Sequence, residues 1–449
     1  MSAGPSDTPV NGIIINGSLS AEKEFDPEKT EQESSLENGL PEIKFEQPET
    51  APPDGGLVAW LQVSGSFILF MNSWGIVNTF GVFEAYYSSI HLSNKTPSDI
   101  AWIGSIQSFL LLLCSSASGP IFDRGYFFAL TIFGSFFTVF GMMMLSLSTE
   151  YWQIMLSQAV CVGFGSGAMF VPSVAIIPQY FVTKRSFATG IAAAGSSFGG
   201  VIFPIIFHRL VGKIGFGWST RVLAFIVLGT QVYAIAVMRV RTTPLIKRQL
   251  FDRSALSDSR FLLVTALLFF GFMGAYIPFY YVSSFATSKG IFNDQISFYL
   301  LPIMNAGSLF GRIAPNFTAD KIGTMNVFVP ATGLSMIVAF SWLAVRSKGG
   351  IILFAIAYGF VSGAFVSLPP SILAGFTKNI HVLGTRMGMA FAAAGFGVLI
   401  GTPVAGALLK TPKTYTAAIL FGAFILLVAF LLSVACRIVK SGTKIFVKT

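Results

Sequence analysis

The chain has 449 residues, of which 53% are hydrophobic and only 11% are charged. Because soluble domains carry charge on about a quarter of their residues, this composition excludes an ordinary soluble enzyme or binding domain and indicates a membrane protein. The formal net charge of +9 does not indicate nucleic-acid binding, since Lys and Arg fall in short gaps between apolar runs.

The first segment, residues 1–56, differs from the rest of the chain. It contains twelve acidic residues and three lysines, together with several Pro and Gly. Such a polar, acidic segment cannot bury enough apolar surface to fold, so we predict a disordered cytoplasmic tail. No cleavable signal peptide is expected, because the first apolar run begins only after this tail.

Twelve apolar runs follow, each long enough to cross a bilayer at roughly 20 residues per span. The first six lie near 58–80, 99–119, 128–148, 153–173, 188–208 and 220–240. The other six lie near 262–282, 297–317, 326–346, 351–371, 388–408 and 416–436. The fold class predicted is therefore an all-α polytopic membrane protein with twelve transmembrane helices.

The longest internal polar gap divides this series six and six. We predict an N-terminal six-helix bundle over 57–240, a cytoplasmic central loop over 241–260, a C-terminal six-helix bundle over 261–437 and a basic cytoplasmic tail over 438–449. With both termini inside, the inner gaps hold sixteen Lys and Arg and the outer gaps nine. Basic residues are retained on the cytoplasmic side, so both termini are predicted to be cytoplasmic, most simply at the plasma membrane, with an organelle membrane as the alternative.

The two halves repeat one another at an offset of about 200 residues. Three matches recur in the same order: Gly163–Ala168 with Gly359–Ala364, Asp123-Arg124 with Asp320-Lys321, and Arg185 before Ala192–Gly195 with Arg386 before Ala392–Gly395. Six helices separate the matches, so the halves have the same topology and are related by an axis along the membrane normal. Such halves can rock around a central site, which predicts transport by alternating access.

Motifs at both halves resemble the major facilitator superfamily over about 54–437. Gly119 through Asp123-Arg124-Gly125 is similar to its loop signature between helices 2 and 3, and Gly311-Arg312 through Asp320–Gly323 is the counterpart. Pro53–Gly56 with Trp60, and Tyr180-Phe181 with Lys184-Arg185 through Ala194–Ser196, resemble motifs of the monocarboxylate porters, most closely their fungal branch. The resemblance implies transport of organic acids, vitamins or secondary metabolites.

Two positions depart from the proton-linked animal porters of that family. Asn78 stands where they have a lysine of helix 1, and Ser308 stands where they have an aspartate one turn before the arginine of helix 8. Only the arginine, Arg312, is retained. These departures disfavour proton-coupled lactate transport by that mechanism.

Arg312 is the residue for which the sequence most strongly predicts a solute contact. A guanidinium two turns inside a helix is costly unless it faces a cavity or a partner, and its planar fork suits a carboxylate. The alternative is that it reaches the inner surface or pairs with Asp320. The other predicted pathway residues are Asn72, Asn78, Gln107, Tyr280 and Asn305, and for each of these a packing role between helices is favoured over solute contact.

A second set of residues is predicted to form a cytoplasmic gate through ion pairs that stabilise one conformation. These are Gly119, Asp123, Arg124, Arg185, Asp320, Lys321 and Arg386. Asn94 begins a glycosylation sequon on the predicted outer face, although Pro97 follows it. A chance match is favoured over use of that site.

We expect a secondary transporter that is monomeric in the bilayer and moves a small organic solute: an organic anion, a vitamin or a secondary metabolite. Efflux of the product of a biosynthetic cluster is one direction of transport that fits, and coupling to protons is left undecided. A proton-linked monocarboxylate uptake carrier is an alternative, and a non-transporting sensor on a transporter scaffold is another. No enzyme, cofactor or metal is expected: the three histidines match no metal spacing, and the Gly195–Gly200 run lies in a span and lacks a P-loop lysine.

Overall fold

The computed structural model describes residues 52–241, 251–377, 383–409 and 415–442, except for the side chains of Asp123 and Asp294. The predicted tail before residue 52 and residues 443–449 of the predicted basic tail lie outside this range. Within the described residues, all regular secondary structure is helical. The predicted all-α fold class is confirmed.

The first half of the chain contains the helices up to residue 237. The first span is a run of four segments: α2 (Leu57–Asn72), α3 (Trp74–Asn78), α4 (Phe80–Tyr86) and the π-helix η1 (Tyr87–His91). It extends past the predicted end at residue 80. The rest are α5 (Pro97–Asp123), α6 (Phe127–Leu145), α7 (Tyr151–Ile154), the π-helix η2 (Met155–Val162), α8 (Gly163–Ala175), η3 (Ile177–Gln179) and α9 (Arg185–Val237).

The second half follows the same plan. It contains η4 (Arg253–Ser257), α10 (Ser259–Ala275), α11 (Ile277–Ser288), α12 (Asp294–Ser297), α13 (Leu300–Ile322), α14 (Thr324–Ser341), η5 (Trp342–Ala344), α15 (Lys348–Ser367), α16 (Pro369–Phe376), α17 (Leu383–Ala407) and α18 (Thr416–Ser441). The predicted division at 241–260 stays a prediction, and residues 242–250 lie outside the described range.

Ten helical segments in the described residues are long and apolar enough to cross a membrane. One of them, α9, contains two spans, because Gly215 breaks it with a φ of 76° and a ψ of 172°, a backbone conformation that glycine adopts without steric cost. The helix α13 has 23 residues, long enough to span, but it carries Arg312, Asn316 and Asp320 and is the least apolar. When α9 is counted as two spans and α13 is added to the ten segments, the chain has the twelve predicted spans.

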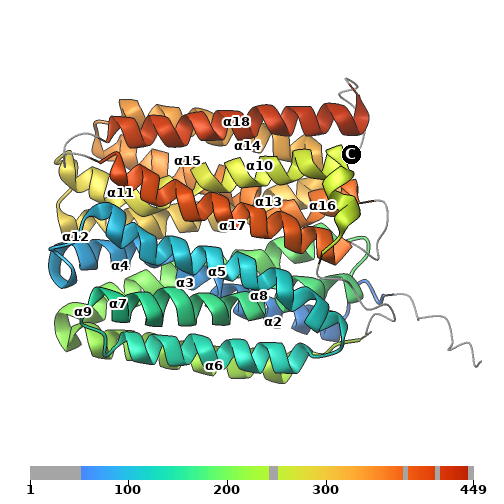
Figure 1. The fold of residues 1–449 in the computed structure, drawn as a ribbon, viewed down its shortest axis with the longest axis horizontal. Helices are drawn as coiled ribbons and strands as arrows, with labels where there is room; N and C mark the ends of the chain where they lie inside the picture. The colour runs from blue at the N-terminus through green and yellow to red at the C-terminus, as the bar shows by residue number, and fades with distance from the viewer. Residues whose placement is uncertain (1–51, 242–250, 378–382, 410–414, 443–449) are drawn as a thin grey trace, which may run out of the picture. The chain divides into compact units, whose positions relative to one another are not determined.

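The two ends of the described chain lie on one face of the bundle. Figure 1 shows the start of α2 and the end of α18 at the same side, with α12 and the end of α4 at the opposite side. We call the side with Leu57 and Ser441 the terminal face, and the side with Gly215 and Gly290 the far face. Every span connects these two faces.

Matching glycines let matching helices approach closely in both halves. A Cβ added at Gly163 or Gly167 of α8 would lie 2.9 and 2.7 Å from backbone oxygens of α5, and a Cβ at Gly359 or Gly363 of α15 would meet backbone oxygens of α13 in the same way. Without a hydrophobic driving force between spans, small residues of this kind allow backbones to pack. The repeat seen in the sequence is therefore a repeat of helix contacts.

Two helix pairs join the halves across the centre of the bundle. The first is α9 with α13, and the second is α5 with α17. Glycines again set the spacing, since a Cβ at Gly190 would lie 2.7 Å from the Arg312 carbonyl oxygen and one at Gly388 would lie 3.0 Å from Ser116 Cα. Larger side chains border a cavity between the α9–α13 pair and the α5–α17 pair.

Candidate functional site

A narrow cavity lies between the halves. Its lining comes from both halves: Phe70, Trp74, Phe170, Val174, Thr189 and Ala193 from the first, and Phe272, Arg312, Val366, Ser367, Pro370 and Phe391 from the second. Val174 lies in the last turn of α8, Thr189 lies near the start of α9, and Pro370 lies in α16. The cavity therefore occupies the part of the bundle between its centre and the terminal face.

One side of the cavity is aromatic. The ring of Phe170 lies 5.6 Å from Phe70, 5.9 Å from Trp74 and 5.8 Å from Phe391, centroid to centroid, and Trp74 lies 6.3 Å from Phe272. Edge-to-face contacts at these spacings are favourable beyond the area they bury. The aromatic surface is shared by both halves, so it changes shape when the halves move.

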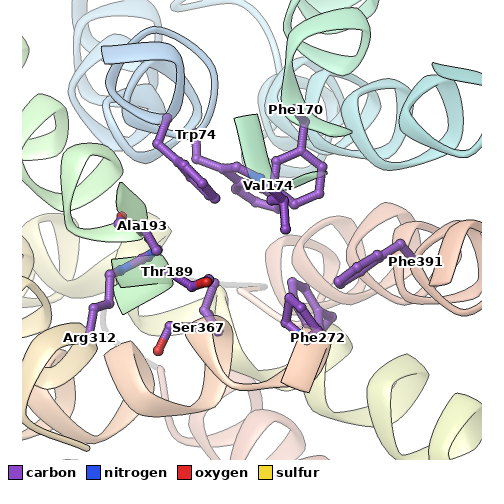
Figure 2. Close-up of a pocket in the computed structure, with 12 residues that line it drawn as sticks. Trp74, Phe170, Val174, Thr189, Ala193, Phe272, Arg312, Ser367 and Phe391 are labelled. Atoms are coloured by element: carbon purple, nitrogen blue, oxygen red, sulfur yellow. Dashed lines mark hydrogen bonds between the residues drawn. The ribbon is translucent and has the colours of Figure 1, made fainter. Parts of the chain in front are cut away.

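The other side of the cavity is polar. Arg312 is the only charged residue among those that line the cavity. Figure 2 shows Arg312, Thr189 and Ser367 on one side of the space, with Phe272 and Phe391 on the other. Arg312 is 3% exposed. Its Nη1 donates to the Ala193 carbonyl oxygen at 3.3 Å and its Nε to Ser308 Oγ at 3.4 Å. Both bonds are long, and a guanidinium has five N–H donors.

No carboxylate neutralises Arg312 within the described part of the chain, where the salt bridges all belong to Arg386. Asp320, the predicted alternative partner, instead accepts the backbone N–H of Phe187 at 3.0 Å. A buried, unneutralised guanidinium is unfavourable in a membrane protein unless a solute or water reaches it. This site is therefore suited to an anion.

A smaller recess adjoins the cavity at Arg312 and Val366, which line both. Asn78, Tyr276, Phe279 and Ser362 are among its other lining residues. Tyr276 stacks on Trp74 at 5.9 Å, and its hydroxyl has no hydrogen-bond partner in the structure. Sequence analysis missed Tyr276, because a tyrosine in a span gives no signal of the direction in which it points.

The other predicted pathway residues occupy different places, and their roles stay predictions. Asn78 lines the recess and donates to the Ser196 carbonyl oxygen at 3.4 Å. Asn72 donates to Thr230 Oγ1 at 2.9 Å, Asn305 donates to the Leu301 carbonyl oxygen at 3.1 Å, Gln107 is fully buried, and Tyr280 packs on Phe80 at 5.0 Å. Asn72, Asn305, Gln107 and Tyr280 are absent from the described linings of both spaces.

The predicted gate residues lie at the terminal face. Gly119 is buried, Arg124 is exposed, Arg185 is partly buried and begins α9, and the Asp123 side chain is outside the described part. Lys321 Nζ lies 4.2 Å from the Phe317 ring centre. The Asp320 bond to Phe187 joins α13 to α9, so one predicted gate residue does connect the two halves here.

Arg386 forms the clearest ion pairs. Its Nε lies 2.9 Å from Asp252 Oδ2 and its Nη1 lies 2.7 Å from Asp258 Oδ2. The Ser254 hydroxyl, together with Arg386, holds the pKa of Asp252 below its usual value, against the opposing effect of burial. These pairs fasten the segment before α10 to the start of α17, within the second half.

The two motifs that resemble monocarboxylate porters contact each other. Asp54 Oδ1 accepts the backbone N–H groups of Val182 at 2.9 Å and Thr183 at 3.1 Å, and its other oxygen accepts the Thr183 hydroxyl. The Thr183 hydroxyl and the Val182 N–H lower the pKa of Asp54. Trp60 completes the contact, 5.1 Å from Phe181. The chain before α2 is therefore fastened to the loop before α9.

Asn94 and Glu84 lie at the far face. Asn94 is exposed, just before Pro97 begins α5, and its glycosylation stays a prediction. Glu84 of α4 is 3% exposed, and its Oε2 has no hydrogen-bond partner in the structure. Sequence analysis missed Glu84 because the predicted first span ended near residue 80, which placed this acid in the gap after the span. An acidic residue inside a span is a signal of function.

Two similar six-helix halves with a cavity lined by both define a membrane transporter that works by alternating access. A family model described as Major Facilitator Superfamily matches residues 63–369. The chain belongs to the major facilitator superfamily and moves a small organic solute.

Comparisons with individual proteins agree with this family. The chain is 46% identical over 379 residues to MFS-type transporter dbaD of Emericella nidulans, covering 82% of this chain and 85% of the relative. It is 36% identical over 397 residues to the aspyridones efflux protein apdF of the same organism, covering 88% and 80%. It is also 36% identical over 427 residues to the fujikurins efflux protein of Gibberella fujikuroi, covering 90% and 91%.

A solved structure shows the same fold. The crystal structure of the nucleoside transporter NupG superposes with a TM-score of 0.65 at 14% sequence identity, covering 84% of this chain and 99% of that one. At this identity the likeness concerns the fold alone.

Proposed function

We propose that the protein exports an aromatic organic anion, the product of a secondary-metabolite pathway, and belongs to the monocarboxylate porter branch of its superfamily. The observation that carries the proposal is the buried, unneutralised Arg312 facing an aromatic surface. The relatives named as efflux proteins for aspyridones and fujikurins support both the direction and the metabolite class.

The charge argument favours an anion over a neutral solute. A carboxylate in the cavity would give the Arg312 guanidinium a charged acceptor in place of two long hydrogen bonds to neutral oxygens. The guanidinium fork can hold both oxygens of a carboxylate. The aromatic side then contacts the apolar body of the solute, so each side of the cavity recognises one part of it.

The proposed orientation places the terminal face in the cytoplasm, at the plasma membrane. The excess of Lys and Arg in gaps at this face supports that orientation, and the cavity lies on the terminal-face side of the centre. A solute made in the cytoplasm would reach this cavity directly. Protease accessibility of tags at both termini in sealed cells tests the orientation, and cleavage from outside would overturn it.

Binding of naphthoate, a fused aromatic carboxylate, tests the site. Titration calorimetry on the protein in nanodiscs should show naphthoate binding more tightly than the neutral naphthyl methanol. Arg312→Ala should weaken naphthoate by about 10- to 100-fold, since a hydrogen bond to a charged group contributes roughly 1.5–3 kcal/mol. Naphthyl methanol should bind both proteins alike.

The matched control is Arg253→Ala, which removes an exposed arginine from the segment before α10. It should leave naphthoate affinity unchanged. Equal affinity of wild type for the acid and the alcohol, or an Arg312→Ala protein that binds naphthoate normally, would overturn the anion site. Counterflow of labelled naphthoate in proteoliposomes then tests transport itself.

A further inference from the structure

The far face of the bundle is closed by contacts between the first helix of each half. The Phe80 ring of α4 lies 5.0 Å from the Tyr280 ring of α11, and a Cβ added at Gly81 would lie 2.8 Å from the Phe279 carbonyl oxygen. Nearby, Ser98 Oγ of α5 donates to the Pro403 carbonyl oxygen of α17 at 3.2 Å. We call these α4–α11 and α5–α17 contacts the far gate.

Glu84 lies inside the far gate. It follows Gly81 by three residues and Phe80 by four, so on a helix it shares the face that packs on α11. Its side chain is 3% exposed, and Oε2 has no hydrogen-bond partner in the structure. Within the described residues, neither recorded salt bridge involves it. It is a buried acid at the contact between the two halves, and the lining of the cavity does not include it.

The titratable side chains within electrostatic range of Glu84 are phenols: Tyr280 and Tyr281 of α11, and Tyr415 before α18. Two other helices also pack on α4. Gly104 of α5 lies against Phe80, and the Phe207 ring of α9 lies 4.6 Å from the Phe83 ring, centroid to centroid. These surroundings offer no compensating positive charge. An unpaired carboxylate is strongly disfavoured in such a place, whereas a neutral carboxylic acid is tolerated.

We propose that Glu84 is a proton-binding residue of the far gate, and that the gate closes only when its carboxyl is protonated. When the halves separate at the far face, water reaches the carboxylate, which takes a proton from hydronium and becomes a neutral acid with release of one water molecule. The neutral side chain can then be buried between α4 and α11. The proton concentration at the far face thereby controls the return of the empty transporter.

This inference rests on the proposed function only in that the halves move, and it does not depend on the charge of the solute. It gives Arg312 and Glu84 separate tasks, because Arg312 lines the cavity and Glu84 does not. A negative result in the naphthoate titration would not contradict the proposal for Glu84. A negative result in the gate experiment would not contradict the anion site at Arg312.

Distances between spin labels on the two halves test the proposal without any solute. Gly212 of α9 and Gly349 of α15 are suitable positions at the far face, because a Cβ at either meets no atom within 4 Å. Both would be changed to cysteine after the three native cysteines are replaced by alanine. Pulsed electron paramagnetic resonance in nanodiscs then measures the distance between about pH 5 and about pH 9, a range in which buried carboxyls titrate.

The labelled protein should shift toward longer distances as pH rises, because ionised Glu84 holds the gate open. Glu84→Gln, which is permanently neutral, should keep the short distance at every pH. Glu84→Asp, which retains an ionisable carboxyl, should restore the shift. The control Glu150→Gln, at an exposed acid of the same face, should behave as the parent.

A pH shift that persists in Glu84→Gln, or a parent protein whose distance does not change with pH, would overturn the proposal. If Glu84→Gln does not yield folded protein, infrared spectroscopy replaces it. A carboxylic-acid C=O band in the parent at neutral pH that moves in Glu84→Asp supports the proposal. A parent protein without that band refutes it.

Discussion

The close approach of α15 to α13 should be sensitive to a single methyl group. A Cβ added at Gly363 would lie 2.6 Å from the Ser308 carbonyl oxygen, whereas real Cβ contacts are at least 3.0 Å, so the helices must separate by the 0.4 Å difference between these values. On the same helix, a Cβ at Gly349 meets no atom within 4 Å. Gly363→Ala and Gly349→Ala thus add the same group with and without a collision.

We expect Gly363→Ala to have a free energy of unfolding lower than that of Gly349→Ala by about 1–3 kcal/mol, the usual cost of overpacking. Alanine is intrinsically favoured over glycine by about 1 kcal/mol in a helix interior, where Gly363 lies, so the collision must outweigh that gain. Gly359→Ala should be more severe, since its Cβ would approach the Met304 carbonyl oxygen more closely. Unfolding by SDS titration from mixed micelles measures all three.

The collision should also reach the cavity. Ser308 Oγ accepts the Arg312 Nε hydrogen bond, so a displaced Ser308 moves the guanidinium. Naphthoate affinity should fall in Gly363→Ala and stay at the wild-type value in Gly349→Ala. Equal stabilities of the two variants would refute the inference that glycine sets the helix spacing here.

Three further outcomes follow from contacts at the edges of the bundle. Arg386→Gln should increase amide hydrogen exchange around Asp252, because it removes the ion pair. Folding lowers the pKa of the Asp252 carboxyl, so the stabilisation from this carboxylate is present above pH 3.8 and is lost as the pH falls below 3.8. Asp54→Asn should increase exchange in the loop before α9, measured by the same method at neutral pH. Asn72→Ala should lower the free energy of unfolding by about 1 kcal/mol and leave naphthoate affinity unchanged, because its Thr230 bond lies outside the cavity lining.

The fold was predictable because length and apolarity determine a span. Helix ends were less so: the first span continues to His91, where Ser88, Ser89 and His91 interrupt the apolar run without ending the helix. The predicted gap between two apolar runs contains Gly215, the residue that breaks α9. The cause of the break, the positive φ of Gly215, depends on backbone geometry that a hydropathy pattern does not contain.

The site was predictable only in part, because hydropathy identifies a charge within a span but does not give the direction in which a side chain points. Arg312 was identifiable, because a charge deep in a span requires an explanation. Asn72 and Asn305 were indistinguishable from Asn78 in sequence, and only the rotation of each helix separates a residue in a recess from one that bonds to a neighbouring helix. Phe170 and Phe391 could not be selected from 46 phenylalanines, since an aromatic cavity residue and a lipid-facing one have the same composition signal.

Two buried ionisable residues show how stability and function are connected in this fold. Arginine and ionised glutamate have opposite charges, so an ion pair between Arg312 and Glu84 would offset much of the cost of burying each one. The structure instead separates them: Arg312 lines the cavity toward the terminal face, and Glu84 lies in the far gate. A fold shaped for stability alone would have paired or replaced them. In the two proposals made above, an anion neutralises Arg312 and a proton neutralises Glu84, each from a different side of the bundle, so that occupancy of either site would alter the balance between the two positions of the halves.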